Sequence, residues 1–426
     1  MTRALERHRP PGPFRPGFWR SPLRGPWLTS VLGMVLLVGF VLVFVTGLLS
    51  YAAYNPNLAP RNDTTPGKDL LGFYLFTWPT RPTWLYWLNQ GVHVTLGLVL
   101  IPVVLAKLWS VLPKLFDWPP VRSPAHLLDR LSLVLLVGST VFEIVTGVMN
   151  IQYYYAWPFG FYEAHLYGAW VFIAAMAVHV AVRSRRIVDA LRSRRLRDEL
   201  RTGVADTAPE APDPDGLVAT DPAEATLSRR GALGLVGASS LALLVLSVGQ
   251  TVGGATRATA LLSPRGQDMG DGPLDFQVNK TAALAGIDPA MTGSAWRLEL
   301  AGATTVLLSR DDLLALPQYT AELPIACVEG WSTGVQSWSG VRLVDLAGMV
   351  GAPDAVLVES LQAGGAFGSA VLARNQVADP LSLLALRVNG VDLSLDHGFP
   401  ARVIVPAAPG VHNTKWVRRL SAAGPS

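Results

Sequence analysis

Five long apolar segments constrain the fold of this chain more than any other feature of its sequence. They span residues 27–49, 84–108, 127–149, 166–182 and 232–252. Each approaches or exceeds the ~20 residues that a helix needs to cross ~30 Å of hydrocarbon. The first begins too far into the chain, and runs too long, for a cleaved secretory signal. With 50% hydrophobic residues overall, we expect membrane helices, four in a bundle and a fifth as an additional anchor.

The basic residues predict how the helices are oriented, because positively charged flanks stay in the cytoplasm. Arginines gather before the first apolar segment and after the fourth, whereas the loop 150–164 has neither Lys nor Arg and is rich in aromatic residues. This distribution explains the net charge of +4 better than nucleic-acid binding does, which we do not expect. The arginines before the first segment are Arg3, Arg7, Arg9, Arg15, Arg20 and Arg24, and those after the fourth are Arg183, Arg185, Arg186, Arg192, Arg194, Arg195, Arg197 and Arg201.

Composition then divides the chain. Residues 202–225 are rich in Ala, Asp, Pro and Gly and cannot bury enough apolar surface to fold, which predicts a linker. After about residue 253, short alternating runs such as 296–300 and 401–405 predict strands with few long helices. We predict a multi-domain protein, an all-α helix bundle followed by a β-rich α+β domain. The predicted boundaries are 1–26 (cytoplasmic basic N-terminus), 27–182 (four-helix membrane bundle), 183–226 (cytoplasmic basic segment and linker), 227–253 (fifth transmembrane helix) and 254–426 (exported domain).

Four histidines lie in or at the edge of the predicted bundle, where ionisable groups are costly and usually functional. They are His93, His126, His165 and His179. His165 and His179 are 14 residues apart, close to four turns, so they share a helix face about 21 Å apart along the axis. With alternating topology, His93 lies at the outer level of His165, and His126 at the cytoplasmic level of His179. Two axial pairs for one or two haem groups are therefore expected.

This pattern resembles the b-type cytochromes that pass electrons between quinol and a peripheral enzyme. One departure is Lys107, which stands 14 residues beyond His93 where the respiratory pattern has a histidine. The alternative is that the histidines make ordinary interfacial or interhelical hydrogen bonds. Glu143 has two interpretations as well, a proton-handling carboxylate or a structural partner for a neighbouring helix, and we favour the second.

The only cysteine, Cys327, lies in the sequence Cys-Val-Glu-Gly-Trp-Ser (327–332). This segment resembles the molybdenum-ligand segment of the sulfite oxidase fold family and, within it, that of the catalytic subunit of periplasmic methionine sulfoxide reductase. A buried, inert thiol is the alternative. The resemblance implies that Cys327 is the molybdenum ligand and catalytic residue, and a soft thiolate suits a metal that the pterin already holds by dithiolene sulfurs.

A second block, His-Gly-Phe-Pro-Ala-Arg-Val-Ile-Val-Pro (397–406) followed by Gly-Val-His-Asn-Thr-Lys-Trp (410–416), extends the resemblance over roughly residues 275–420. A strand arginine followed by a glycine loop and a lysine can hold a phosphate. The resemblance implies a molybdopterin-binding domain. The residues that it places at the cofactor are Asn279, Cys327, Ser360, His397, Arg402, His412, Asn413, Thr414 and Lys415.

Two departures from the family shape the expected function. The segment after Cys327 lacks the arginines that sulfite-oxidising members use for an anionic substrate, and no dimerisation domain follows residue 416, so a homodimer of that type is not expected. We expect a membrane-bound oxidoreductase that takes electrons from the quinone pool through haem b to reduce an S- or N-oxide. The alternatives are a sulfite-type dehydrogenase running in reverse and a non-catalytic, membrane-tethered binding scaffold.

The start of the fifth apolar segment bears on location. Ser-Arg-Arg-Gly-Ala-Leu (228–233) resembles a twin-arginine export signal, although Ala232 stands where Phe or Leu is usual. The alternative is that Arg229 and Arg230 only obey the positive-inside rule. We expect a multi-pass protein of a bacterial cell membrane, in contact with lipid, whose molybdopterin domain is exported folded to the extracytoplasmic side.

Overall fold

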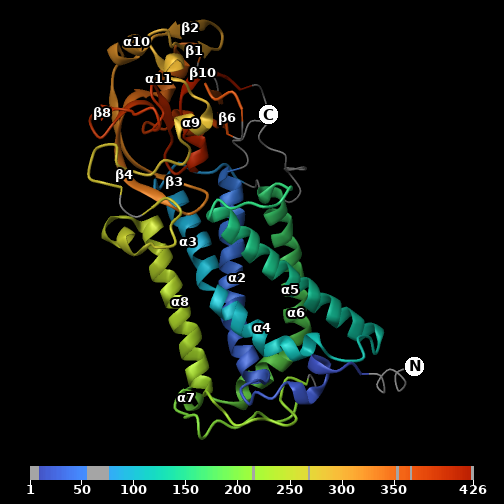
Figure 1. Ribbon diagram of the computed structural model, residues 1–426. Coiled ribbons are helices and arrows are strands. Elements are labelled where there is room, and N and C mark those ends of the chain that lie inside the picture. Colours follow the sequence, from blue (N-terminus) through green and yellow to red (C-terminus); the bar gives the residue numbers. More distant parts are fainter. Residues whose placement is uncertain are drawn as a thin grey trace. The chain divides into compact units, whose positions relative to one another are not determined.

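The structure, a computed structural model, describes residues 9–54, 76–213, 216–266, 269–351, 355–364 and 367–423 (Figure 1). Arg3 and Arg7 of the predicted basic N-terminus lie outside these residues. Two compact units divide the chain. The first comprises Met1–Phe44 and Leu96–Leu244, and the second comprises Val45–Thr95 and Val245–Ser426.

Five helical spans of the described residues are long and apolar enough to cross a membrane, judged by length and composition. Each of the five apolar segments overlaps one of them. They are formed by α2 (Pro26–Tyr54), α3 (Leu85–Val99) with α4 (Ile101–Leu115), α5 (Pro124–Ile151), α6 (Phe161–Ser193) and α8 (Arg229–Val252).

Two of these spans differ from the sequence prediction. The second is divided at Leu100, because Pro102 in the first turn of α4 has no backbone N–H to continue the helical hydrogen bonds. The fourth does not end near Val182, since α6 continues through the arginines to Ser193. Residues 183–193 contain no Gly or Pro, so the charges end the apolar segment without ending the helix.

The predicted linker is more closely packed than its composition indicates. Among its described residues, no helix or strand separates α7 (Leu196–Glu199) from α8. Nevertheless, the buried Glu210 carboxylate accepts the backbone N–H of Trp27 at 2.9 Å, at the first turn of α2. Helix N-termini leave such N–H groups without intrahelical partners and favour negative charge. Glu210 is thus buried within the segment whose composition predicts a linker.

Beyond residue 281 the second unit consists mainly of strands, with helices of no more than six residues, as predicted. The helices are α9 (Ala282–Ala285), α10 (Arg310–Ala315), α11 (Leu343–Gly348) and α12 (Arg374–Ala378), and the 3-10 turns include η3 (Gly254–Thr259), η4 (Pro289–Thr292) and η5 (Gly410–His412). The strands are β1 (Leu298–Ala301), β2 (Thr305–Leu308), β3 (Tyr319–Ala326), β4 (Ser332–Arg342), β5 (Val356–Ser360), β6 (Ser369–Leu372), β7 (Leu383–Val388), β8 (Val391–Asp392), β9 (Arg402–Ile404) and β10 (Val417–Ala422). The runs 296–300 and 401–405 thus contain β1 and β9.

These strands form two sheets of five. One has the order β2-β1-β10-β5-β6, in which β1 and β10 are parallel and the other pairs antiparallel. The other has the order β3-β4-β7-β8, with β9 also paired to β7. Buried and partly exposed residues alternate along β1 and β5, as expected of strands with one face on a core.

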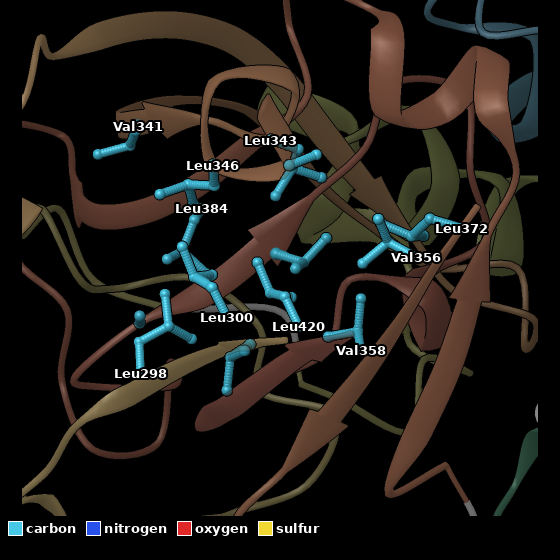
Figure 2. Close-up of a cluster of buried hydrophobic side chains, with 14 of the residues drawn as sticks. Leu298, Leu300, Val341, Leu343, Leu346, Val356, Val358, Leu372, Leu384 and Leu420 are labelled. Carbon is cyan, nitrogen blue, oxygen red and sulfur yellow. The ribbon is translucent and has the colours of Figure 1, made fainter. Parts of the chain in front are cut away.

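The core collects the apolar faces of both sheets together with α11 (Figure 2). Leu298 and Leu420 come from one sheet, Leu384 from the other, and Leu346 from the helix, and all are buried. Truncating such a leucine to alanine typically costs about 2–5 kcal/mol. β3 packs in a second buried cluster through Leu323 and Ile325, together with Trp338 of β4 and Ile404 of β9. The two clusters hold β3, β4, β9 and β10, and the candidate site lies at the ends of these four strands.

Candidate active site

Cys327 lies in the five-residue turn that joins β3 to β4. Its backbone N–H donates to the Trp331 carbonyl at 2.9 Å, and the Gly330 N–H donates to the Cys327 carbonyl at 3.0 Å. Gly330 has φ +88°, a left-handed conformation that favours glycine. The turn buries the thiol to 3% exposure, and the thiol donates a short hydrogen bond to the Glu329 carboxylate.

The surroundings of the thiol oppose its ionisation. Burial raises the pKa of Cys327 well above its ordinary value, and the Glu329 carboxylate raises that pKa further. The Arg265 guanidinium lowers the pKa, but by less. The thiolate therefore requires a further positive charge, which a bound metal ion supplies.

A small pocket adjoins the thiol. Five of the residues predicted at the cofactor line it: Asn279, Cys327, His397, Arg402 and Lys415. The space between the side chains is about 10 Å³, roughly that of one water molecule. The structure thus brings together residues from three distant parts of the chain, near positions 279, 327 and 397–415.

Arg402 begins β9 and is only 5% exposed. Its guanidinium donates to the His397 carbonyl at 3.0 Å and to the Asn413 carbonyl at 3.1 Å, and it lies over the Trp338 ring. Burial lowers the pKa of Arg402 from 12.5 to about 9. A buried cation of this kind is costly unless an anion accompanies it.

Lys415 is the second buried basic residue of the pocket. Its ammonium donates to the carbonyls of Lys280 and Asp396, the latter at 2.9 Å. Burial, followed by the charge of Arg402, lowers the pKa of Lys415 to about 6. The Ser360 hydroxyl donates to the Lys415 carbonyl at 2.8 Å, so Ser360 holds the backbone of Lys415 and is not among the pocket-lining residues.

The histidines of this region have different surroundings. His397 lines the pocket, and its Nδ1 lies 2.7 Å from the Ser394 hydroxyl. His412 is fully buried away from the pocket, with Nε2 2.9 Å from the Tyr54 carbonyl. Burial lowers the pKa of both histidines to about 4, and the Arg402 charge contributes at His397.

Asn413 and Thr414 are also absent from the described lining of the pocket. Asn413 contacts Arg402 through its backbone carbonyl, which accepts a hydrogen bond from the guanidinium. The side-chain oxygen of Asn413 accepts the Val405 N–H at 2.8 Å. Their cofactor-binding roles therefore stay predictions, as do those of Ser360 and His412.

Several pocket residues escaped the sequence prediction. Gln277, Trp331 and Asp396 line the pocket, and each lies within two residues of a predicted site residue or inside a quoted motif. Their closeness in the sequence to predicted site residues was the only signal that could have identified them. Arg265, whose guanidinium lies over the Trp331 ring and donates to the Asn279 carbonyl, belongs to no motif that the sequence analysis recognised.

Comparison with known families gives this geometry a context. Residues 285–424 match the family described as oxidoreductase molybdopterin binding domain. The chain carries a sulfite oxidase-like molybdopterin-binding domain. That domain contains Cys327, Arg402 and Lys415.

The relatives match only a part of this chain. Human mitochondrial sulfite oxidase is 33% identical in an alignment of 163 positions that covers 31% of this chain and 30% of that protein. The uncharacterized oxidoreductase YuiH of Bacillus subtilis is 34% identical over 127 residues, 29% of this chain and 64% of that protein. This chain spans about 30% of the length of the mammalian relatives. The crystal structure of the sulfane dehydrogenase SoxCD from Paracoccus pantotrophus aligns over 30% of this chain and 38% of that chain at 25% identity, with a TM-score of 0.28, too low to bear on the fold.

The residues of the molybdopterin-binding domain fit an anionic cofactor with a metal. Among the described residues, Arg402 Nε and Thr414 Oγ1 are buried polar atoms without a hydrogen-bond partner. Such atoms are rare in folded proteins and call for a partner. One soft thiol beside two buried cations matches the donor set that a dithiolene-bound metal and a phosphate require.

The histidines of the apolar helices have separate surroundings. In the first unit, His165 Nδ1 lies 2.9 Å from the Glu143 carboxylate, so Glu143 has a partner on the neighbouring helix α6. His126, at the start of α5, lies 3.7 Å from Asp117. In the second unit, His93 Nδ1 lies 3.3 Å from the Thr46 hydroxyl. The axial haem pairs stay a prediction.

His179 lines a larger cavity within the first unit, of about 180 Å³. The apolar wall includes Phe40 and Met176, and the cationic side chains at the cavity are Lys107, Lys114, Arg183 and Arg186. Asp129 pairs with two of these cations, Lys114 at 3.4 Å and Arg183 at 2.8 Å. His126 is not among the described residues that line this cavity.

Proposed function

We propose that the chain is a membrane-bound, molybdopterin-dependent oxidoreductase that passes electrons from the quinone pool, through membrane haem b, to a small S- or N-oxide. The observation that carries this proposal is the convergence of Cys327, Arg402 and Lys415 on one pocket. A thiol with two buried cations has no evident structural purpose, since burial disfavours the charged form of each of the three.

Five of the residues that line the pocket have a defined role in this proposal. Cys327 would ligate the molybdenum, Arg402 and Lys415 would hold the pterin phosphate, and Asn279 and His397 would contact the pterin. When bound, the cofactor supplies oxygen-atom exchange coupled to two electrons. Glu329 already accepts a hydrogen bond from the thiol, so its carboxylate lies beside the sulfur that would ligate the metal.

Lys415 would have to move when the cofactor binds. Its ammonium now bonds two backbone carbonyls in a pocket of about 10 Å³. A phosphate offers a full negative charge in place of these neutral acceptors, and would raise the pKa of Lys415 from about 6 towards its ordinary value. In this proposal the ammonium of Lys415 exchanges its two carbonyl acceptors for the phosphate when the cofactor binds.

The apolar helices would deliver the electrons. Support comes from their length and composition and from the histidines among them. His165 is oriented by a carboxylate, as haem-ligating histidines often are, and His179 lines a cavity with an apolar wall and a cationic side. The quinone would exchange electrons with this haem in a bacterial cell membrane, with the molybdopterin domain on the extracytoplasmic side, as the arginine distribution favours.

A sulfite-type dehydrogenase, in which electrons flow towards the quinone, is the second candidate. It is favoured by the printed name of the mammalian relatives, sulfite oxidase. Against it, residues 328–341 contain no arginine that could bind an anionic substrate near Cys327. Within the reductase proposal, the Cys-Val-Glu-Gly-Trp-Ser segment favours a sulfoxide, by its resemblance to the periplasmic methionine sulfoxide reductase.

Metal analysis followed by a substrate panel tests the proposal. We expect the purified full chain to contain about one molybdenum per chain and to oxidise a reduced dye with sulfoxides or N-oxides, but not to reduce the oxidised dye with sulfite. Protein prepared with molybdenum in supply but free of it would refute the enzyme. Dye reduction by sulfite alone would establish the reverse direction.

A further inference from the structure

The turn that carries Cys327 is held from outside the two sheets. The carbonyls of residues 328 and 330 in the turn, and of residue 332 at the start of β4, each accept a hydrogen bond from a side chain that lies before residue 260. Gln90 Nε2 of α3 donates to the Val328 carbonyl at 2.5 Å, and Thr251 Oγ1 of α8 donates to the Gly330 carbonyl at 2.5 Å. Arg257 of η3 donates to the residue 332 carbonyl at 2.6 Å. All these residues belong to the second unit.

Side chains of α3 also pack against the turn that carries Cys327. A Cβ atom at Gly330 would lie 2.7 Å from the Val94 Cβ, so α3 approaches the turn closely enough to exclude any larger residue there. Tyr86, one helical turn before Gln90, is 0% exposed and packs in one cluster with Ala326 and Val328. These two residues are the immediate neighbours of Cys327 in the sequence.

The donors themselves are fixed by contacts between the two helices. The Trp87 indole N–H donates to the Thr251 carbonyl at 2.7 Å. A Cβ atom at Gly91 would lie 2.3 Å from Thr251 Cγ2, so this glycine admits the threonine side chain against α3. Thr251 therefore reaches Gly330 from a site that α3 determines.

We propose that Gln90 and Thr251 are positioning residues for Cys327, through which the apolar helices set the orientation of the sulfur. The inference rests on the proposed function, in which this sulfur is the molybdenum ligand. Its consequence is that the molybdopterin-binding domain is tuned by the helices that would deliver its electrons. Changes in α3 or α8 then alter the metal site although neither helix contributes a ligand to it.

Thiol labelling of the cofactor-free full chain tests this without any metal. Cys327 is the only cysteine of the chain and is buried, so a maleimide reacts only when the turn opens. Thr251→Val and Gln90→Leu each remove one donor at similar side-chain volume. Since one such bond is worth about 1 kcal/mol, we expect each variant to react about fivefold faster than the parent. Thr251→Ser, which keeps the hydroxyl, should restore the parent rate.

The matched control is Thr259→Val, which removes hydroxyl hydrogen bonds to the Val245 carbonyl at 3.0 Å and the Thr256 carbonyl at 2.9 Å, neither of them in the turn. Rates should be measured at several low urea concentrations, because opening of a short turn depends weakly on urea and global unfolding strongly. Rates equal to that of Thr259→Val, or an increase that follows the urea dependence of unfolding, would overturn the proposal.

A second measurement separates this inference from the proposed function. In molybdenum-loaded protein, Gln90→Leu and Thr251→Val should shift the g-values of the Mo(V) resonance, whereas Thr259→Val should not. If the loaded parent shows no molybdenum signal, the proposed function fails, and the labelling rates still decide whether the helices position Cys327. Unshifted g-values in a loaded enzyme would refute the tuning of the metal while leaving its presence intact.

Discussion

Replacing Arg402 by methionine should separate cofactor binding from folding. Methionine keeps the unbranched, flexible part of the side chain and removes the guanidinium with its charge. In the cofactor-free protein, the guanidinium is buried with two backbone carbonyls as acceptors, and no ion pair is formed by it among the described residues. The cost of this charge and the value of its two hydrogen bonds therefore oppose each other.

The structure gives the magnitudes. A pKa of about 9 in place of 12.5 corresponds to about 5 kcal/mol against the charged form, and this cost is fully present at pH 7, where Arg402 is charged in the folded and the unfolded chain. Arg402→Met removes it but leaves the His397 and Asn413 carbonyls without a donor, at about 1–3 kcal/mol each. The removed cost and the added cost of about 2–6 kcal/mol for the two carbonyls nearly cancel, so the free energy of unfolding should change by no more than about 3 kcal/mol. Phosphate binding, in contrast, loses charge-assisted bonds worth about 1.5–3 kcal/mol each.

The assay compares molybdenum content with stability. Protein from cells able to make the cofactor should lose most of its molybdenum on Arg402→Met, while the urea midpoint of cofactor-free protein moves little. Arg418→Met is the matched control, because Arg418 lies on the adjacent β10, is 52% exposed and pairs with Glu359 outside the pocket. Full molybdenum content in Arg402→Met, or a loss of stability beyond about 4 kcal/mol, would show that this arginine serves the fold and not the cofactor.

Three further outcomes follow from the same groups. Cys327→Ser should leave a folded protein whose turnover falls more than about 100-fold, since changes even beyond the ligand shell cost 10–100-fold; unchanged turnover would remove Cys327 from the site. His412 has a folded pKa of about 4 against 6.5 unfolded, so below pH 6.5 the unfolded chain binds a proton that the folded chain does not bind; His412 should contribute about 3 kcal/mol to the loss of stability of the cofactor-free protein from pH 6.5 to 4, and His412→Gln should remove this share of the urea-midpoint profile while the similar share of His397 stays. His179→Ala should reduce a b-type absorption spectrum, and membranes without any such spectrum, prepared with haem in supply, would refute the haem proposal.

The sequence predicted those features that local composition or a motif determines. Apolar length identified all five helical spans, and alternation identified β1 and β9. The resemblance around Cys327 and Arg402 selected residues that the fold brings to one pocket, although they are 75 positions apart (327 to 402). Motifs succeed here because each contains several residues that the fold places at the same pocket.

Contacts made by single side chains across long stretches of sequence could not be predicted. Gln90 appeared as one polar residue in an apolar segment, and its bond to Val328 joins residues 238 positions apart. Glu210 lay in a segment whose composition predicted a loose linker, yet it accepts the first N–H groups of α2. Arg265 and Arg257 carried no motif at all. In each case the partner is set by tertiary packing, which one-dimensional patterns do not encode.

The two arginines at the start of α8 now have distinguishable roles. Arg229 is 1% exposed and donates to the carbonyls of Pro22 and Ala208, both at 3.0 Å, while its guanidinium lies 3.4 Å from Glu199. Arg230 is exposed. A lysine cannot supply the planar set of donors that Arg229 uses, so Arg229→Lys should weaken the first unit whether or not the pair directs export. Only Arg230→Lys isolates the export signal.

We therefore expect Arg230→Lys alone to leave molybdenum insertion and the stability of the first unit unchanged, and to keep the residues after 253 inside the cell, out of reach of external protease. Twin-arginine recognition requires this result, because both arginines belong to the signal. The positive-inside rule predicts the opposite, since lysine preserves the flanking charge. If Arg230→Lys exports a loaded domain and only Arg229→Lys fails, the pair is explained by the contacts of Arg229 with Pro22, Ala208 and Glu199, and the export hypothesis is wrong.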